Sequence, residues 1–352
     1  MSAIRFKSYQ SEMQMLNPFN GFAEDRHVIE VREDPLLGDK SVYNPVVREK
    51  VKFFFRDCDE LLIAKLIEES AKTCLFCDDR LEKNTPRYPD ALVSEGRIRV
   101  GEAVLFPNLY PVGKYHSVIV LTKAHFLRLS EFRPEIISNG LRAAQRFINT
   151  VYDKDQESVC VAVNANYLFP AGATFVHPHL QMLVTTTPYS YHDRIIRACQ
   201  SYYQENDSEY YPDLIEEEKL IGTRYIAESG DWHWLAAFSP TGVNEINAIH
   251  ESESDFGKLS DTDLVTLATG ISKVLALYED FGHLSFNYSV YSVRDSFNKG
   301  GFRCNLKMIS RQNLYPNYRN DDYFLQKLLQ TELIINLPED LAIKMRKLYQ
   351  ED

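Results

Sequence analysis

The chain has 352 residues and a formal net charge of −11, from 50 acidic and 39 basic side chains. This excess of negative charge excludes a broad nucleic-acid-binding surface, although a few local positive groups suffice to bind a phosphorylated small molecule. The hydrophobic content of 44% and charged content of 25% are ordinary for a globular protein. The length suits two domains of usual size.

The sequence gives three indications of the compartment in which the protein is found. No apolar run reaches 18 residues, so we expect no membrane span, and residues 1–20 lack the pattern of a signal peptide. The six cysteines show no spacing typical of a disulfide framework. We therefore expect a cytoplasmic protein in a reducing compartment.

Turn signals and apolar periodicity predict the elements of the first half. Residues 1–60 are expected to be rich in loops, with turns at 17–21 and 34–39. A short helix is predicted over 57–72, and a long helix is predicted from about 129 to 152 because its apolar residues recur at helical spacing. Strands are predicted over residues 98–105, 117–122 and 159–164.

The second half repeats the order of these elements after a helical and then acidic connector at 193–220. A helix over 261–280 and a strand over 284–290 follow in the order seen in the first half. Residues 303–309 then align with the stretch 177–183, so that Arg303, Asn305 and Lys307 stand at the positions of His177, His179 and Gln181. We infer a duplication in which the first copy alone kept the imidazoles; a chance likeness of common α+β patterns is the alternative.

The stretch 174–184 contains the strongest candidate residues. As a strand, it would place His177, His179 and Gln181 on one face, because side chains alternate with period 2. Directly upstream, the small residues 171–174 predict a turn whose backbone N–H groups approach an anion. The combination predicts a site for a phosphorylated ligand.

A metal site is predicted from Cys74 and Cys77, whose Cys-x-x-Cys spacing lets two thiolates share one ion. Tetrahedral zinc needs two more ligands, for which we choose His125 and His177. The alternative is a pair of buried cysteines without a metal. A site closed by four protein ligands would be structural, holding the N-terminal segment against the strand with the histidines.

His179 then remains without a metal and is a candidate nucleophile. An imidazole that attacks an α-phosphorus forms a phosphoramidate, and Gln181 can donate a hydrogen bond to the phosphoryl oxygens. An amide at that position suits a leaving group that needs no proton, such as a sugar phosphate. His116 is a weaker candidate, and we interpret it as a surface or strand residue.

Residues 177–181, His-Pro-His-Leu-Gln, resemble the His-Pro-His-x-Gln signature of the galactose-1-phosphate uridylyltransferases. That family belongs to the histidine-triad superfamily, with nucleotide-sugar phosphorylases such as ADP-glucose phosphorylase as relatives. The resemblance extends over nearly the whole chain. Further similar stretches are residues 32–38, 106–111, 166–174, 232–235 and 286–289.

The resemblance implies a duplicated histidine-triad-like α+β fold of two mainly antiparallel half-barrel sheets with flanking helices, and a homodimer. It implies zinc on Cys74, Cys77, His125 and His177, and nucleotidylation of His179 with Gln181 as its partner. The second half has Asn305 and Lys307 where the family has a His-x-His metal motif, so the resemblance does not extend to a second metal. The substrate contacts that it implies are Arg48, Asn108, Asn166, Gly172, Ala173, Thr174 and Glu332.

We therefore predict a domain over residues 1–205, with the zinc and the catalytic histidine, and a second domain over 206–352. The predicted activity is the transfer of a UMP-like nucleoside monophosphate between a nucleotide sugar and a sugar 1-phosphate through a nucleotidyl-His intermediate, and the sequence does not distinguish uridine from adenosine as the base. Two alternatives remain: a nucleotide-sugar or dinucleotide phosphorylase that uses inorganic phosphate, and a nucleotide-sugar-binding protein without catalysis. The sequence motif at Gln330-Thr331-Glu332 departs from the family's Gly-Tyr-Glu, so galactose is not fixed as the sugar.

Overall fold

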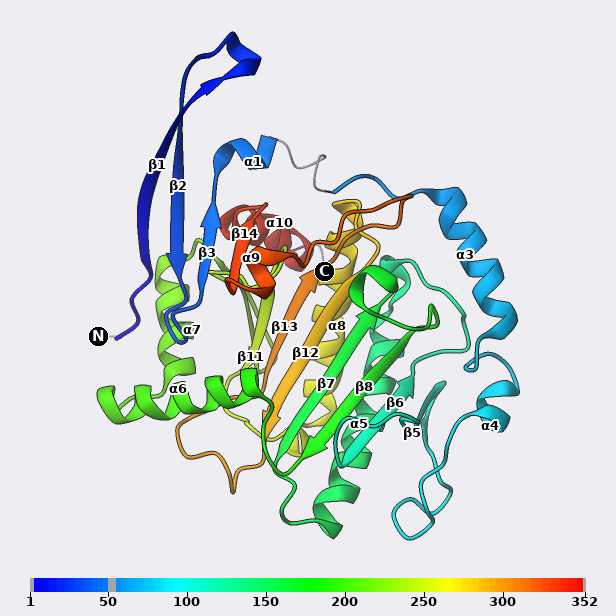
Figure 1. The fold of residues 1–352 in the computed structure, drawn as a ribbon. Coiled ribbons are helices and arrows are strands. Elements are labelled where there is room, and N and C mark those ends of the chain that lie inside the picture. The colour runs from blue at the N-terminus through cyan, green and yellow to red at the C-terminus, as the bar shows by residue number, and fades with distance from the viewer. Residues whose placement is uncertain (1–2, 50–54, 351–352) are drawn as a thin grey trace.

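Both halves of the chain contribute five strands to one antiparallel sheet of ten, which confirms the predicted α+β fold (Figure 1). The structure is a computed structural model that describes residues 3–49 and 55–350. The two five-stranded halves of this sheet join where β7 pairs with β12 along eight residue pairs. In spatial order the strands are β4 (Ile98–Val100), β5 (Ala103–Pro107), β6 (Tyr115–Val120), β8 (His179–Thr185), β7 (Cys160–Tyr167), β12 (Phe286–Val293), β13 (Asn305–Ser310), β11 (Ile246–His250), β10 (Trp232–Ala236) and β9 (Tyr225–Ser229).

The two halves of this sheet have the same topology. In each half the strands follow in the order first, second, third, fifth and fourth, and a long helix connects the third strand to the fourth. These helices, α5 (Pro134–Lys154) and α8 (Asp261–Asp280), pack against each other and cover one face of the sheet (Figure 1). Their apolar stripes and the sheet residues below them form one core that extends through both halves.

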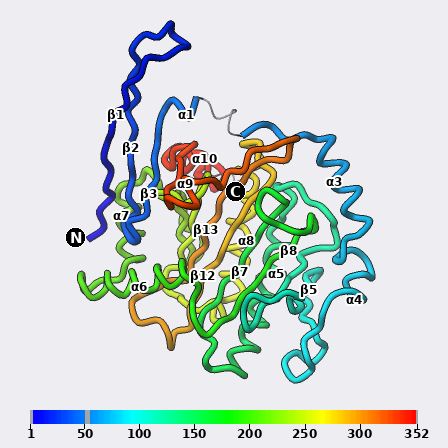
Figure 2. The backbone as a smooth tube through the Cα atoms, in the orientation of Figure 1, coloured from blue at the N-terminus to red at the C-terminus, as the bar shows by residue number. Residues whose placement is uncertain are grey.

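A smaller sheet combines the two ends of the chain. It has the order β1 (Lys7–Asn17), β2 (Ala23–Glu33), β3 (Lys40–Tyr43) and β14 (Thr331–Ile334), with β14 parallel to β3. The hairpin of β1 and β2 projects from the rest of the molecule (Figures 1 and 2). The expectation of a loop-rich N-terminus was wrong, because residues on both faces of this hairpin are exposed and the period-2 apolar signal is therefore weak.

Some other predicted boundaries of helices and strands differ from those in the structure. The expected strand over 98–105 is a hairpin, because Gly101 takes a left-handed φ of +55° and turns the chain between β4 and β5. The connector at 193–220 is helical as predicted, and residue 205 lies in the last turn of its first helix. The other α-helices in the described part of the chain are α1 (Pro45–Glu49), α3 (Glu60–Thr73), α4 (Arg80–Asn84), α6 (Ser190–Asn206), α7 (Tyr210–Ile221), α9 (Phe324–Lys327) and α10 (Pro338–Gln350).

None of the helices in the described ranges 3–49 and 55–350 has the length and apolar character needed to cross a membrane.

Glycines at matching positions of the two long helices allow close packing on the sheet. A Cβ atom added to Gly270 in α8 would lie 1.9 Å from Cζ2 of Trp234, a fully buried ring on β10. A Cβ atom added to Gly140 in α5 would lie 2.3 Å from Cδ2 of Leu121, the end of a flexible side chain. The same position therefore faces a rigid neighbour in one half and an adaptable one in the other.

We predict that Gly270→Ala lowers the free energy of unfolding by about 1–3 kcal/mol, the usual cost of overpacking a core. Gly140→Ala should cost less, because Leu121 can change rotamer. Urea unfolding of both variants measures the difference, with Thr262→Ala, an exposed position of α8, as the control. Equal losses in the two glycine variants would contradict this account.

Candidate active site

The four predicted metal ligands lie together in the structure. Sγ of Cys74 and Cys77 and the ring nitrogens of His125 and His177 all lie within 4.8 Å of one another. Nδ1 of His177 is 3.7 Å from Sγ of Cys74 and 3.4 Å from Sγ of Cys77, and Nδ1 of His125 is 3.2 Å from Sγ of Cys77. Ligands of tetrahedral zinc are separated by about 3.5 Å, given Zn–S and Zn–N bonds of about 2.3 and 2.1 Å. The donor set therefore fits a metal ion.

The outer nitrogen of each imidazole in this cluster has its own partner. Nε2 of His177 donates to the carbonyl oxygen of Thr122 at 2.7 Å, and Nε2 of His125 lies 2.8 Å from Oγ of Ser70. A proton on Nε2 leaves the Nδ1 lone pair free to bind a metal. Burial also lowers the pKa of His177 to about 4, which keeps this ring neutral at pH 7.

Three segments that are distant in the sequence meet at the cluster. The cysteines follow the end of α3, His125 lies in the loop after β6, and His177 lies in a bend just before β8. The expectation that the strand begins at 174 was wrong, since β8 begins at His179. Pro178, which has no N–H group to donate, separates the bend from the strand.

His179 is held by the backbone of His177. Nδ1 of His179 lies 2.8 Å from the carbonyl oxygen of His177, and a carbonyl can only accept, so Nδ1 carries the proton. The lone pair of the neutral ring is then on Nε2, which makes no hydrogen bond within the described part of the chain. Burial lowers the pKa of His179, so this imidazole stays neutral and nucleophilic at neutral pH.

The amide of Gln181 is oriented by two neighbours. Its Oε1 lies 2.9 Å from Nε2 of His116 and 3.4 Å from Nδ2 of Asn108. Nδ1 of His116 accepts the N–H of Val112 at 3.2 Å, so Nε2 of His116 carries the proton and donates to Gln181. Oδ1 of Asn108 accepts the N–H of Tyr110, which directs the Asn108 amide nitrogen toward Gln181. With its oxygen held, the NH2 group of Gln181 is free to donate to a ligand.

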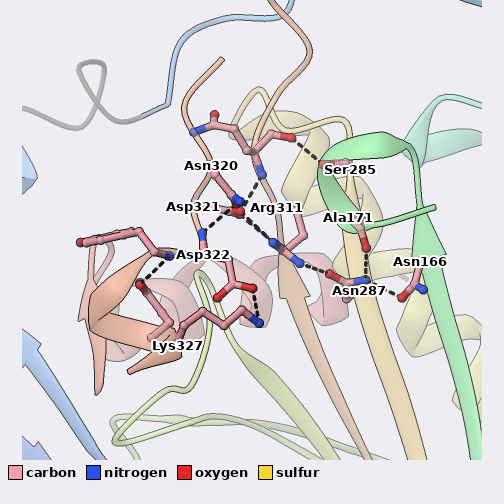
Figure 3. Close-up of polar contacts among 12 residues, drawn as sticks. Asn166, Ala171, Ser285, Asn287, Arg311, Asn320, Asp321, Asp322 and Lys327 are labelled. Atoms are coloured by element: carbon pink, nitrogen blue, oxygen red, sulfur yellow. Dashed lines mark hydrogen bonds and ion pairs between the residues drawn. The ribbon is translucent and has the colours of Figure 1, made fainter. Parts of the chain in front are cut away.

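The small-residue turn is tied to the second half of the chain (Figure 3). Nδ2 of Asn287 donates to Oδ1 of Asn166 at 2.7 Å and to the carbonyl oxygen of Ala171 at 2.9 Å. Oδ1 of Asn287 accepts from Arg311, which also forms two hydrogen bonds with Asp321. This chain of contacts fixes the turn from across the β7–β12 junction.

Within this turn, Gly172 adopts a φ of +85°, and its N–H donates to the carbonyl oxygen of Phe169. The N–H of Ala173 donates to the carbonyl oxygen of Leu168. These two N–H groups are therefore used within the turn, while Thr174 is exposed. The substrate contacts of Gly172, Ala173 and Thr174 remain predictions.

Arg48 and Glu332 lie with the small sheet rather than beside β8. Arg48 on α1 pairs with Asp340 at 2.7 Å, and Glu332 on β14 accepts a hydrogen bond from Gln326 at 2.8 Å. Burial raises the pKa of Glu332 to about 7. No hydrogen bond or ion pair in the described ranges joins either side chain to His179.

His116, Ser70 and Thr122 are site residues that sequence reasoning did not select. His116 lies on β6, as its interpretation as a strand residue expects, but it is buried rather than on the surface and contacts Gln181. The sequence shows that His116 and Val118 are two residues apart and so face the same side of a strand. It does not show that Val118 pairs with Gln181, which is the register that brings the side chains of His116 and Gln181 together.

No family model matches the chain. An uncharacterised protein of Archaeoglobus fulgidus is 28% identical over 344 residues, which cover 97% of this chain and 99% of that protein.

Three solved structures have the same arrangement of elements. An ADP-glucose phosphorylase from Arabidopsis thaliana, with bound ADP-glucose, has a TM-score of 0.67 and 20% identity, over 91% of this chain and 99% of its own. A GalT-like protein from the same plant has a TM-score of 0.66 and 19% identity, over 90% and 98%. A uridylyltransferase mutant has a TM-score of 0.64 and 15% identity, over 91% and 99%. The chain thus has the duplicated α+β fold of the uridylyltransferases and of ADP-glucose phosphorylase, as the resemblance of residues 177–181 predicted.

Proposed function

We propose that the protein is a zinc-containing nucleotidylyltransferase that works through a nucleotidyl-His179 intermediate. The observation that carries the proposal is the hydrogen bond from Nδ1 of His179 to the carbonyl of His177, which leaves the lone pair on Nε2. The fold shared with an ADP-glucose phosphorylase that holds ADP-glucose supports a nucleotide sugar as donor. The acceptor is a sugar 1-phosphate, with inorganic phosphate as the alternative.

The reaction proceeds in two displacements at phosphorus. In the first, Nε2 of His179 attacks the α-phosphorus, the P–N bond forms, and the sugar 1-phosphate leaves with the electron pair of the broken P–O bond. In the second, a phosphate oxygen of the acceptor attacks the same phosphorus and the P–N bond breaks. Gln181 donates to the phosphoryl oxygens in both steps, because His116 and Asn108 hold its carbonyl oxygen away from the substrate.

Zinc on Cys74, Cys77, His125 and His177 has a structural role in this proposal, since four protein ligands leave no open position. It would supply a cross-link between three segments of the chain. The residue that depends on it is His177, whose carbonyl oxygen orients the nucleophile. The metal site thereby supports the catalytic geometry without contact with the substrate.

Arg48 and Glu332 are engaged at the small sheet, by Asp340 and Gln326. We propose both as substrate contacts and a homodimer as the assembly, and sedimentation equilibrium measures the oligomeric state.

We predict one tightly bound zinc ion per chain, measurable by elemental analysis of the purified protein. Cys74→Ser should lose most of the metal and lower the melting temperature, because the cross-link between the three segments is weakened. Cys199→Ser, at a buried cysteine outside the cluster, is the matched control and should keep the zinc. A metal-free wild-type protein, or zinc retained in full by Cys74→Ser, would show that the cluster is not the site.

The proposed nucleophile predicts a covalent adduct on His179. The protein incubated with a nucleotide sugar should gain the mass of a nucleoside monophosphate, in a linkage labile to acid and stable to base. His179→Gly should abolish turnover while it keeps the zinc and the fold, and added imidazole should restore part of the activity by filling the cavity. Exchange of labelled sugar 1-phosphate into its nucleotide sugar at the normal rate in His179→Gly would refute the assignment.

The contact between His116 and Gln181 predicts a positioning role for His116. His116→Leu should lower kcat by roughly ten- to a hundredfold, less than the loss of a transition-state donor itself can cost, while KM changes little. His116→Gln, which can still donate to Gln181, should recover much of the rate. If the two variants lose activity equally and melt at the same lowered temperature, the role of His116 is structural only.

A further inference from the structure

Two asparagines of β7 point to the same side of the large sheet as His179 and Gln181. Asn164 pairs with Gln181, and Asn166 lies two residues further along the strand, where side chains face that side again. Continued by one residue, the register of β7 with β8 brings Asn166 opposite His179. Both asparagine amides are therefore candidates for contact with a group bound at His179.

The NH2 groups of these two asparagines differ in what they bind. Nδ2 of Asn164 donates to the carbonyl oxygens of Ala162 and Gln181 at 3.3 and 3.2 Å, and its Oδ1 accepts from Oγ of Ser289. Nδ2 of Asn166 makes no hydrogen bond within residues 3–49 and 55–350, and the residue is half-buried. Of the two, Asn166 has donors left for a ligand.

The direction of the Asn166 amide is set by Asn287 on β12 (Figure 3). Nδ2 of Asn287 lies 2.9 Å from the carbonyl oxygen of Ala171 and 3.4 Å from that of Ala165. Carbonyl oxygens can only accept, so the amide nitrogen of Asn287 is the atom that faces them. The same nitrogen lies 2.7 Å from Oδ1 of Asn166. Because this nitrogen can only donate, Asn166 turns its oxygen toward Asn287 and its NH2 group away from it.

Arg311 and Asp321 fix the other end of the Asn287 amide. Nη1 of Arg311 donates to Oδ1 of Asn287 at 2.6 Å, and a guanidinium offers no acceptor to an amide nitrogen. Asp321 holds Arg311 through two hydrogen bonds of 2.9 and 2.8 Å, and both side chains are largely buried. A bidentate pair of this kind keeps the guanidinium in one orientation. The amide of Asn287 is therefore oriented in the same sense from both of its ends.

We propose that Asn287 is a positioning residue of the transfer reaction and that it acts through Asn166. It presents the NH2 group of Asn166 to the phosphoryl group that His179 attacks, where developing negative charge strengthens the hydrogen bond. This role rests on the proposed function, and it adds a second oriented donor to that of Gln181. It also gives the second half of the chain a part in the chemistry, because Asn287 and the ion pair that holds it both lie there.

Asn287→Asp tests this role with an almost unchanged side-chain shape. The new carboxylate can still accept from Arg311, but it cannot donate, so Asn166 should turn its NH2 group toward it and away from the substrate. The measurement is the exchange of labelled glucose 1-phosphate into ADP-glucose and UDP-glucose, and of labelled galactose 1-phosphate into UDP-galactose. We expect the maximal exchange rate to fall by roughly ten- to a hundredfold while KM changes little, because a donor to the transition state is misdirected.

A double-mutant cycle with Asn166→Ala separates this role from a general loss of structure. Once Asn166 is alanine, Asn287→Asp should cost less than about twofold, because the donor that it directs is gone. Asn313→Asp is the matched control. Nδ2 of this buried asparagine also donates to two backbone carbonyls, those of Arg56 and Gly282, at 2.9 and 2.7 Å. The control makes the same chemical change away from the site and should leave the maximal rate unchanged.

The positioning role is overturned by a normal rate in Asn287→Asp, by an undiminished loss in the Asn166→Ala background, or by an equal loss in Asn313→Asp. Thermal unfolding establishes whether Asn287→Asp is folded, and if it is not, Asn287→Ala enters the same cycle with the same criteria. Exchange in the unsubstituted protein that Asn287→Asp matches rejects the positioning role alone. An unsubstituted protein with neither exchange nor an adduct on His179 rejects the transfer reaction, and the positioning role with it.

Discussion

The pairing of β7 with β12 is the interaction on which the rest of the structure depends. It aligns Asn164 with Ser289, and Oγ of Ser289 donates to Oδ1 of Asn164 at 2.7 Å across the junction. Because the neighbouring strands keep the same register on both sides, a pseudo-twofold axis passes between these two residues. One continuous core can then form under both halves, and Asn287 can reach across to hold the turn at Ala171. In an isolated half, β7 or β12 would be an edge strand with unpaired backbone N–H and C=O groups.

This symmetry places different side chains at equivalent backbone positions of the two halves. His177 donates from Nε2 to the carbonyl of Thr122, and Arg303, its counterpart, donates from Nε to the carbonyl of Glu251 at 3.1 Å. The contact with the backbone is thus the same in both halves, whereas the other atoms of the two side chains have different partners. His177 faces two cysteine sulfurs, whereas Arg303 pairs with Glu209. Likewise Glu245 contacts Lys307 where His116 contacts Gln181, so an ion pair replaces an oriented amide.

Sequence reasoning reached those features that local patterns determine. Cys-x-x-Cys spacing, the periodic apolar face of 261–280 and the alignment of Lys307 with Gln181 each depend on a few neighbouring residues, and the structure places these residues as expected. The partners of Gln181 and the position of Arg48 depend on which strands pair and in which register. A short stretch of sequence does not contain that information. The β1–β2 hairpin was missed for a different reason, since an arm with two exposed faces needs no apolar alternation.

The orientation of the proposed nucleophile, His179, depends on the backbone and not on a neighbouring side chain. His179 is aligned by a backbone carbonyl, so no particular side chain is required at the accepting position. What the geometry does require is that the bend before β8 stay in place, and this bend is fixed at His177 from two sides, by the sulfurs of the cysteines and by Thr122. In the proposed mechanism the two histidines therefore act as one unit, in which His177 holds the backbone and His179 reacts. In the second half, Arg303 makes the corresponding contact with the backbone at Glu251 although both imidazoles are absent there.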